Sequence, residues 1–370
     1  MERSTLDAFH HVEFFVSNAH QAAYYYCISF GFERFAIRRT TSSTSVAIRN
    51  QSVIFVFTSF SDGNSQYASH IIEHGDNVKD IAFRCLVKKG GYLLDAARTL
   101  NDKFGSVRMA TIATTHSDMR HTLVDISNYA GFFLPEFEKY DDNNSLVTQL
   151  EKIPVEALDH IVENFPIGSL EDVTRWYFDT FNLHRFWSID EKICHSEFSA
   201  MKSMLLTNET HSVQVAIAEP VVNTRRGRSQ IQEYIDYNGG PGVQHMAFRV
   251  SDIITTIEKM KRRGVEFLMV PSSYYDDLEQ RLANSSVEIA EDLKKIRELS
   301  ILVDFDDSGY LLQIFTQPVQ DRPTLFIEII QRRNFNGFGA GNFKALFDAV
   351  EREQAKRGTL IVNGLPTRHY

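Results

Sequence analysis

Three residues in the second half of the chain, His160, His245 and Glu328, have side chains of the types that bind a transition metal. Each stands in a short apolar segment that we expect to form a strand, and 85 and 83 residues separate them. No local motif can hold a metal over such distances, so only the fold could bring them together. Because alternate side chains of a strand share one face, single inward residues from several strands can converge inside a curved sheet.

The expected chemistry of this set follows from its ligands. Two neutral imidazoles and one carboxylate on one face of an octahedron leave three positions open, an arrangement typical of non-haem iron(II) oxygenases. Residue types alone support this weakly, because 13 His and 48 acidic residues allow many such triples, and a single strand histidine is more often structural. A buried Glu328 in the apolar segment 325–330 is nevertheless costly unless it is paired or binds a cation.

An internal repeat strengthens the metal hypothesis. Residues 9–12 (FHHV) and 158–161 (LDHI) open the two halves, and VKDIAFR at 78–84 matches VQHMAFR at 243–249 in four of seven positions. His11 therefore corresponds to His160, but Asp80 stands where the second half has His245. We predict that the first copy keeps the scaffold and lacks the ligand set.

The elements that must position these residues indicate an α+β fold, in which each half contains a strand, a helix and several strands. Apolar spacing predicts helices from residue 19 to Gly31 and over 173–181. Further along, we expect helices over 252–263 and 342–356, a polar stretch with helical character over 272–298, and strands over 300–304, 310–315 and 326–331. The polar run 141–152 is the predicted domain boundary.

Composition and charge exclude several classes of protein. The net charge of −9 argues against a nucleic-acid partner, and the basic cluster at 225–228 is short enough to be a solvated loop. No apolar run reaches the length of a membrane span, and the first residues do not resemble a secretory signal. Cys27, Cys85 and Cys194 lack metal-type spacing, so we expect reduced thiols in a cytoplasmic protein.

Longer strings resemble the 4-hydroxyphenylpyruvate dioxygenase family, which has the vicinal oxygen chelate fold. The second half carries SQIQEYIDYNGGPGVQHMAF (229–248), GYLLQIFTQPVQDRPTLFIEIIQR (309–332), GFGAGNFKALF (337–347) and LHRFWSID (183–190). The first half contributes AHQAAYYYCISFGFE (19–33) and EHGDNVKDIAF (73–83). The resemblance implies two tandem domains of repeated βαβββ modules: a structural domain without metal at 1–145, and a catalytic domain at 153–370 with a C-terminal gating helix.

The resemblance also implies the site. His160, His245 and Glu328 match the family's Fe(II) ligands. The expected substrate-site residues are Ser203, Gln230, Gln244, Gln313, Phe315, Phe326, Asn342 and Phe343. Without the resemblance, Gln244 and Gln313 would be interpreted as ordinary polar residues of strands, and Phe326 and Phe343 as core packing.

The function implied is the conversion of 4-hydroxyphenylpyruvate and O2 to homogentisate and CO2 in tyrosine catabolism, by a homodimer. The chain departs from the family at Ala216 and Ala218, where Pro and Asn are usual. A paralogue with another outcome, such as a 4-hydroxymandelate synthase, therefore stays open, although the synthases carry a smaller aliphatic residue in place of Phe343. A non-catalytic binding protein on the same fold is the third alternative, and an extradiol dioxygenase or glyoxalase is disfavoured by the Gly-Asn-Phe string at 341–343.

Overall fold

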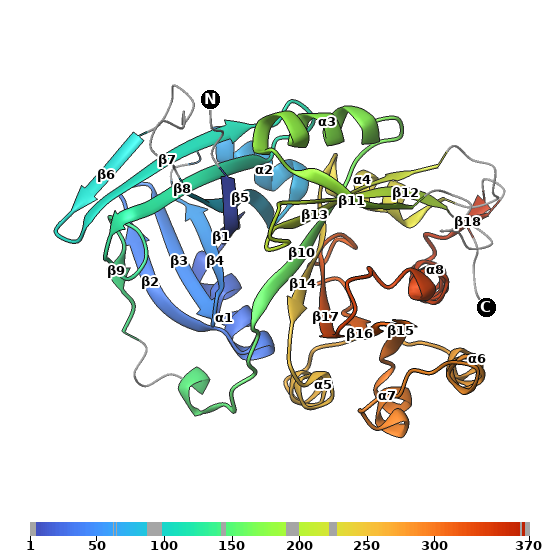
Figure 1. Cartoon of the computed structure of the whole chain (residues 1–370). Coiled ribbons are helices and arrows are strands. Elements are labelled where there is room, and N and C mark those ends of the chain that lie inside the picture. The colour runs from blue at the N-terminus through green and yellow to red at the C-terminus, as the bar shows by residue number, and fades with distance from the viewer. Residues whose placement is uncertain are drawn as a thin grey trace.

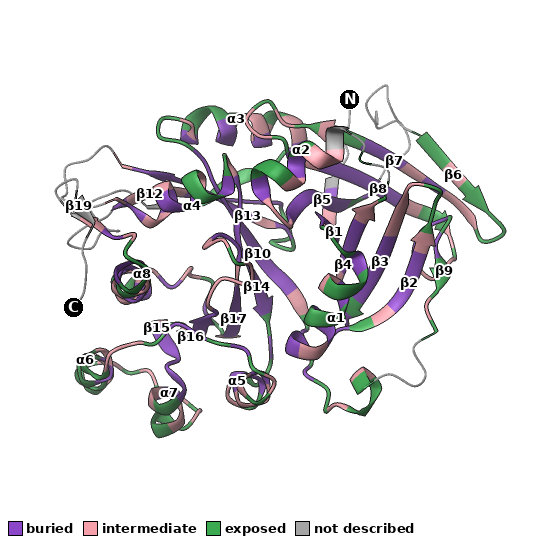
Figure 2. Cartoon of the chain, turned by 180° about the vertical axis from the view of Figure 1, so that it is seen from behind, coloured by how far each residue is buried: buried purple, intermediate pink, exposed green. Residues whose placement is uncertain are grey.

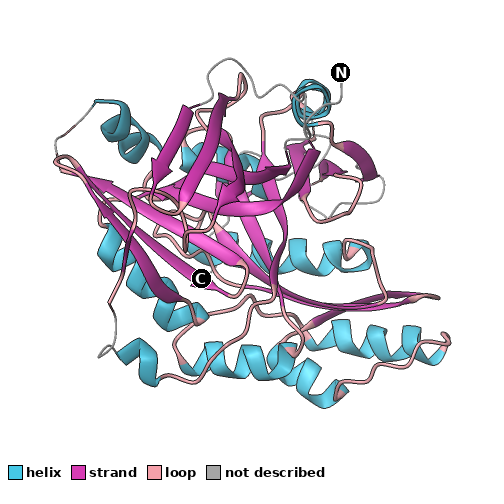
Figure 3. Cartoon of the chain, turned by 60° about the vertical axis from the view of Figure 1, so that its left-hand side comes forward, coloured by secondary structure: helices cyan, strands magenta, loops and turns pink. Residues whose placement is uncertain are grey.

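The computed structural model describes residues 5–61, 63, 65–86, 98–141, 146–189, 200–221, 228–362 and 365–366. Two large curved sheets form the centre of the molecule, and helices lie outside them (Figures 1 and 3). The polypeptide crosses from one sheet to the other through a short 3-10 helix, Leu146–Gln149. The predicted α+β class is confirmed.

The first sheet has the strand order β6-β7-β8-β5-β1-β4-β3-β2-β9. Its strands are β1 (Thr5–Phe15), β2 (Glu33–Arg39), β3 (Ser43–Asn50), β4 (Val53–Phe60), β5 (Asn77–Leu86), β6 (Arg98–Asp102), β7 (Gly105–Ala113), β8 (Arg120–Tyr129) and β9 (Glu138–Lys139). Two helices belong to this half, α1 (Ala19–Phe30) and α2 (Ser65–His74).

The second sheet has the order β11-β12-β13-β10-β14-β17-β16-β15. Its strands are β10 (Ala157–Asn164), β11 (His184–Ile189), β12 (Met201–Thr207), β13 (Gln214–Pro220), β14 (Gly242–Arg249), β15 (Leu302–Asp306), β16 (Gly309–Phe315) and β17 (Phe326–Arg333). Its helices are α3 (Leu170–Phe181), α4 (Gln230–Asn238), α5 (Ile253–Arg262), α6 (Ser272–Ala283), α7 (Leu293–Leu299) and α8 (Phe343–Arg357). A two-stranded sheet of β18 (Ile361–Val362) and β19 (Leu365–Pro366) follows.

The sheet orders show the repeat directly. β1, α1, β2, β3 and β4 form one βαβββ module, and β10, α3, β11, β12 and β13 form another. In both sheets the two modules meet through an antiparallel pair, β1 with β5 and β10 with β14. Residues 87–97, which follow β5, lie outside the described residues. In the last module, α5, α6 and α7 lie between β14 and β15.

The helices begin and end where the sequence provides caps. The side chains of Asn18 and Asp252 accept hydrogen bonds from the first turns of α1 and α5. Gly31 ends α1 in the left-handed conformation, with a φ of 76°. The helical character predicted for 272–298 is found in α6 and α7, which residues 284–292 separate, and the side chain of Asp292 caps the start of α7. The terminal helix is confirmed as α8.

The two halves share one hydrophobic core. The ring of Phe55 in β4 lies 5.8 Å from the ring of Phe248 in β14, and Phe32 lies equally close to Phe248. The Asn50 amide donates to the carbonyl of Ile153 and accepts from the amide of Val155, which fixes the crossing segment. Figure 2 shows the buried residues concentrated in the central strands, β10, β14 and β17 among them. The strands that carry the candidate ligands are therefore rigidly held.

Candidate metal centre and substrate pocket

The three candidate ligands lie on three adjacent strands, β10, β14 and β17. Ala247 in the middle strand pairs with His160 on one side and Glu328 on the other, so these side chains share a face. His245 precedes Ala247 by two residues and points to the same face. The small Ala247 leaves space between them, so the strand register accounts for a convergence that the sequence spacing could not.

A β-bulge refines the aim of His160. The pairing of β10 with β14 shifts between Leu158 and His160, which leaves Asp159 as the extra residue. The Nδ1 atom of His160 lies 2.9 Å from Oδ1 of Asp159, and both side chains are almost completely buried. The Asp159 carboxylate therefore fixes the orientation of the imidazole from behind, as carboxylates do for metal-binding histidines.

The donor atoms meet at one point. Nε2 of His160 lies 3.1 Å from Oε2 of Glu328, and Nε2 of His245 lies 3.4 Å from the same oxygen. The Nδ1 atom of His245 lies 2.9 Å from Oε1 of Gln244. An Nδ1 proton donated to Asp159 or Gln244 leaves each Nε2 lone pair directed at the shared centre. All three ligand atoms lie within 4.8 Å of one another.

The electrostatics of this cluster suit a cation. Burial alone would raise the pKa of Glu328, but His160 and His245 outweigh it and lower the pKa to about 2. Burial would likewise lower the pKa of His160, whereas Glu328 and Asp159 raise it. Oε1 of Glu328 is buried and has no hydrogen-bond partner within the described protein. An ionised carboxylate with one unused oxygen beside two oriented imidazoles fits a metal cofactor.

The centre opens into a cavity that collects nearly all the predicted substrate-site residues. Seven of the eight line it together with the three ligands: Ser203, Gln230, Gln244, Gln313, Phe315, Phe326 and Phe343. Phe326 stacks on the ring of His245 at 4.8 Å between centroids. Leu346 and Phe347 of α8 also line the cavity, so this helix contributes to its wall. Gln230, Gln244 and Gln313 add side-chain amide groups to a lining that is otherwise mostly apolar.

Asn342, the eighth predicted residue, is not part of this lining. Its Oδ1 accepts a hydrogen bond of 2.7 Å from the hydroxyl of Tyr274, and its side chain is fully buried. Asn342 therefore holds the segment before α8 against the helix α6. The structure thus places Asn342 outside the lining, and the nitrogen of its side-chain amide has no hydrogen-bond partner among the described residues.

Several lining residues were not predicted. Phe338 lies 4.2 Å from the ring of His160, and Trp187 lies 6.4 Å from the rings of Phe338 and Phe343. Val162, Met201, Leu205 and Phe347 are further lining residues that were not predicted. Phe338 belongs to the string GFGAGNF and Trp187 to LHRFWSID, so the signal for both was present in the motifs that carried the resemblance.

The two departures from the family pattern line the cavity. Ala216 and Ala218 lie on β13, and Ala218 pairs with Ser203 on one side and Asn164 on the other. The Asn164 side chain is fully buried, and its amide nitrogen and oxygen have no hydrogen-bond partner within the described residues. A methyl group at 218 thus borders a carboxamide whose hydrogen-bonding capacity is unused.

The first half repeats this geometry without its ligands. His11 pairs with Ala82 as His160 pairs with Ala247, after an equivalent bulge. Asp80 takes the position of His245, as the repeat predicted. Its carboxylate accepts hydrogen bonds from the backbone amide and the hydroxyl of Thr122. Burial raises the pKa of Asp80 to about 7. These hydrogen bonds close the position that a cation would take.

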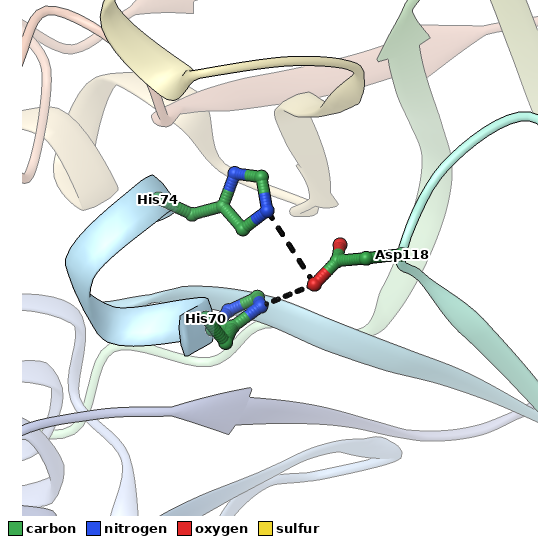
Figure 4. Close-up of side chains that lie close together, drawn as sticks. All are labelled: His70, His74 and Asp118. Carbon is green, nitrogen blue, oxygen red and sulfur yellow. Dashed lines mark hydrogen bonds and ion pairs between the residues drawn. The ribbon is translucent and has the colours of Figure 1, made fainter. Parts of the chain in front are cut away.

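A second histidine cluster belongs to the first half (Figure 4). Nδ1 of His70 and Nε2 of His74 lie 2.8 and 3.4 Å from Oδ2 of Asp118. The ammonium of Lys79 lies 2.6 Å from the same oxygen and also donates to the backbone carbonyl of Asp118. Lys79 therefore already supplies the positive charge that a metal would bring. Because His74 also contacts the carbonyl of Asn238 at 2.6 Å, the cluster ties the two halves together.

Comparisons with known proteins agree with this description. Residues 157–314 match the Glyoxalase/Bleomycin resistance protein/Dioxygenase superfamily. The chain is 44% identical to the 4-hydroxyphenylpyruvate dioxygenase of Caenorhabditis elegans, over 98% of this chain and 95% of the relative. It is 46% identical to the enzyme of that name from Danio rerio, over 98% and 94%.

Two further matches bear on the outcome of the reaction. Another Caenorhabditis elegans protein, whose name states no activity, is 52% identical over 96% of this chain and all of its own length. A solved mutant of the 4-hydroxymandelate synthase from Streptomyces coelicolor superposes with a TM-score of 0.80 at 29% identity, over 95% of this chain and 99% of that one.

No helix among the described residues is long and apolar enough to cross a membrane.

Proposed function

Because the chain belongs to the 4-hydroxyphenylpyruvate dioxygenase family, we propose that it converts 4-hydroxyphenylpyruvate and O2 to homogentisate and CO2, as a step of tyrosine catabolism. The observation that carries the proposal is the convergence of His160, His245 and Glu328 at the end of an apolar cavity. We propose that these three residues hold iron(II). Bound there, the metal would accept the carboxylate and 2-oxo group of the substrate as a chelating ligand and would activate dioxygen for oxidative decarboxylation and ring hydroxylation.

The cavity lining supports a substrate whose carboxylate group binds at the metal. Among the described residues that line it there is no Lys or Arg. A 2-oxo carboxylate placed elsewhere in this cavity would be buried without a counter-charge, which is costly. At the metal, in contrast, it meets a cation whose charge Glu328 neutralises only in part. The substrate is thereby oriented with its acid group at His160, His245 and Glu328 and its ring in the apolar part.

The rest of the lining then has defined tasks. Phe326 and Phe343 would hold the aromatic ring, since aromatic faces pack well on one another. Gln230, Gln244 and Gln313 would position the polar groups of the substrate by hydrogen bonds. These side chains and α8 would also exclude water from the cavity.

A second outcome has specific support. In Caenorhabditis elegans a protein with no activity in its name is more similar to this chain than the named dioxygenase is, at 52% against 44% identity. Ala216 and Ala218 change the wall that sets the substrate's position, and Asn164 beside Ala218 has hydrogen-bonding capacity to spare. Oxidation at the benzylic carbon, which gives 4-hydroxymandelate, is therefore the competing proposal.

Product identification tests both proposals. The purified protein is loaded anaerobically with iron(II), supplied with 4-hydroxyphenylpyruvate and O2, and the product is identified by chromatography against standards. The chromatography is essential because homogentisate and 4-hydroxymandelate have the same elemental formula. Homogentisate as the main product supports the first proposal, and 4-hydroxymandelate refutes it in favour of the second. O2 consumption that requires neither iron nor Glu328 would contradict both.

The variant Ala218→Asn sharpens the comparison. If the methyl group at 218 sets the outcome, the asparagine should shift the ratio of the two products, because it would give Asn164 and Ser203 a polar neighbour. The matched control is Ala216→Ser, which adds a polar atom two residues away on the same wall.

We further propose, from the family resemblance, a cytoplasmic homodimer with a structural domain at 1–145 and a catalytic domain at 153–370.

A further inference from the structure

Arg332, near the end of β17, lies behind the metal centre and outside the cavity lining. Its Nε donates to Oδ2 of Asp159 at 2.9 Å, and its Nη2 donates to Oδ1 at 2.7 Å. The two groups form a parallel, two-pronged pair in which the carboxylate side chain is only 1% exposed and the guanidinium 14%. This is the geometry in which an arginine fixes a carboxylate most firmly.

The same guanidinium also holds a loop. Its remaining nitrogen, Nη1, donates to the carbonyl of Gly337 at 2.7 Å and to that of Phe335 at 3.2 Å. The next residue, Phe338, brings its ring to 4.2 Å from the ring of His160 and lines the cavity. Arg332 thus binds, at one end, the carboxylate that orients a ligand and, at the other, the loop that covers that ligand.

We infer that Asp159 and Arg332 couple occupation of the metal centre to the closure of the 335–339 loop over the cavity; this inference rests on the proposed metal site. A cation on Nε2 of His160 favours the tautomer that donates from Nδ1 to Asp159. The cation thereby fixes the Asp159 carboxylate and, through the Arg332 guanidinium, the two loop carbonyls in one arrangement. Without the cation the imidazole is held only by its contacts with Asp159 and Glu328, so the arrangement loses one of its constraints.

Gly339 shows how closely the loop approaches the cavity. Its φ is 72°, and a Cβ atom there would lie 2.3 Å from Nε2 of Gln313. Phe335, at the other end of the loop, is buried in a cluster with Ala247, the residue between His160 and Glu328. The loop thus packs on Ala247 of β14 at one end and approaches Gln313 of β16 at the other, so it lies directly against the wall of the cavity.

The test uses Co(II), an oxygen-stable probe, and requires no turnover. Co(II) affinity is measured by titration calorimetry, and amide hydrogen exchange is followed in the peptide that covers 334–339, with and without the ion. In the native protein we expect Co(II) to slow exchange in this peptide. In Arg332→Gln the slowing should disappear, and Co(II) should bind about 10- to 100-fold more weakly. Arg333→Gln is the matched control, since Arg333 pairs with Glu291 instead.

Arg332→Lys extends the test should the glutamine variant fold poorly. It keeps the charge but replaces the fork with a single ammonium, so it should retain part of the affinity and lose the protection of the loop. Equal protection of the loop in the native protein and in Arg332→Lys would overturn the inference, as would the absence of any Co(II) binding by the native protein. A native protein that binds Co(II) and protects the loop but forms neither product would refute only the proposed function.

Discussion

The prediction that tests the metal centre most directly is the replacement of Glu328 by Gln, which keeps the shape of the side chain and removes its charge. In the metal-free protein the pKa of Glu328 is held at about 2, against an ordinary value of 4.5. At about 1.4 kcal/mol per pKa unit, the ionised form contributes about 3 kcal/mol to the free energy of unfolding at pH 7. Glu328→Gln should lose this amount.

The metal adds a second, separable effect. A ligand present at about 100 times its Kd stabilises the folded state by about 2.7 kcal/mol. Glu328→Gln should show almost none of this gain, because an amide is a poor replacement for the only anionic ligand. The free energies of unfolding of the native protein and the variant should therefore differ by about 3 kcal/mol without Co(II) and by about 6 kcal/mol with it.

Urea unfolding with and without Co(II) measures both effects. The pKa of Glu328 is lowered in the folded state, so its contribution is complete above the ordinary pKa of 4.5 and is lost as the pH falls towards 2. The difference between the metal-free proteins should shrink over that range. Glu163→Gln, which changes another buried carboxyl of the same sheet, should keep the full Co(II) effect. A Glu328→Gln variant that Co(II) stabilises as much as the native protein would refute the assignment.

Two further predictions concern residues around the site. Burial raises the pKa of Glu163 to about 7, so the stabilising contribution of this carboxyl is present below pH 4.5 and is lost as the pH rises towards 7. Glu163→Gln should therefore be more stable than the native protein above pH 8. Urea unfolding should show a gain of up to about 3 kcal/mol. No gain at pH 8 would contradict the raised pKa. Gly339→Ala should displace Gln313 and lower kcat/KM at least about 10-fold, or about 1.4 kcal/mol of transition-state stabilisation. Gly358→Ala is its control, because Gly358 has the same φ of 72° and no atom within 4 Å of an added Cβ; equal effects of the two variants would assign the loss to backbone strain alone.

The sequence alone could predict the three candidate ligands because they depend on features that a strand encodes locally. Each apolar segment marks a buried strand, and the internal repeat identifies which histidine of each half occupies the same position. The register that places His160 and Glu328 on either side of Ala247 is a property of strand pairing, which no local pattern specifies. The family resemblance supplied that missing information for the ligands and for seven residues of the pocket.

Long-range contacts account for what the sequence did not predict. Arg332 contacts Asp159, 173 positions earlier, and nothing in the neighbourhood of either residue signals the pair. His70 and His74 are the opposite case, because two histidines four residues apart on a helix are a common metal-binding pattern. Here Lys79 from the next strand occupies the space beside Asp118. Only the tertiary structure distinguishes a cation site from a site that the protein has already neutralised.

The two halves differ at the positions that correspond to the proposed metal ligands. In the first half, Asp80 is satisfied by two hydrogen bonds from Thr122, which occupies the position of Glu328 by strand register. Introducing a histidine at 80 alone would remove the acceptor of both hydrogen bonds, and a glutamate at 122 alone would place a second carboxyl beside Asp80. Each single change leaves buried polar groups or like charges unpaired, at about 1–3 kcal/mol or more. A metal centre in the first half therefore requires both changes together, which makes the hydrogen-bonded pair a stable end point of the duplication.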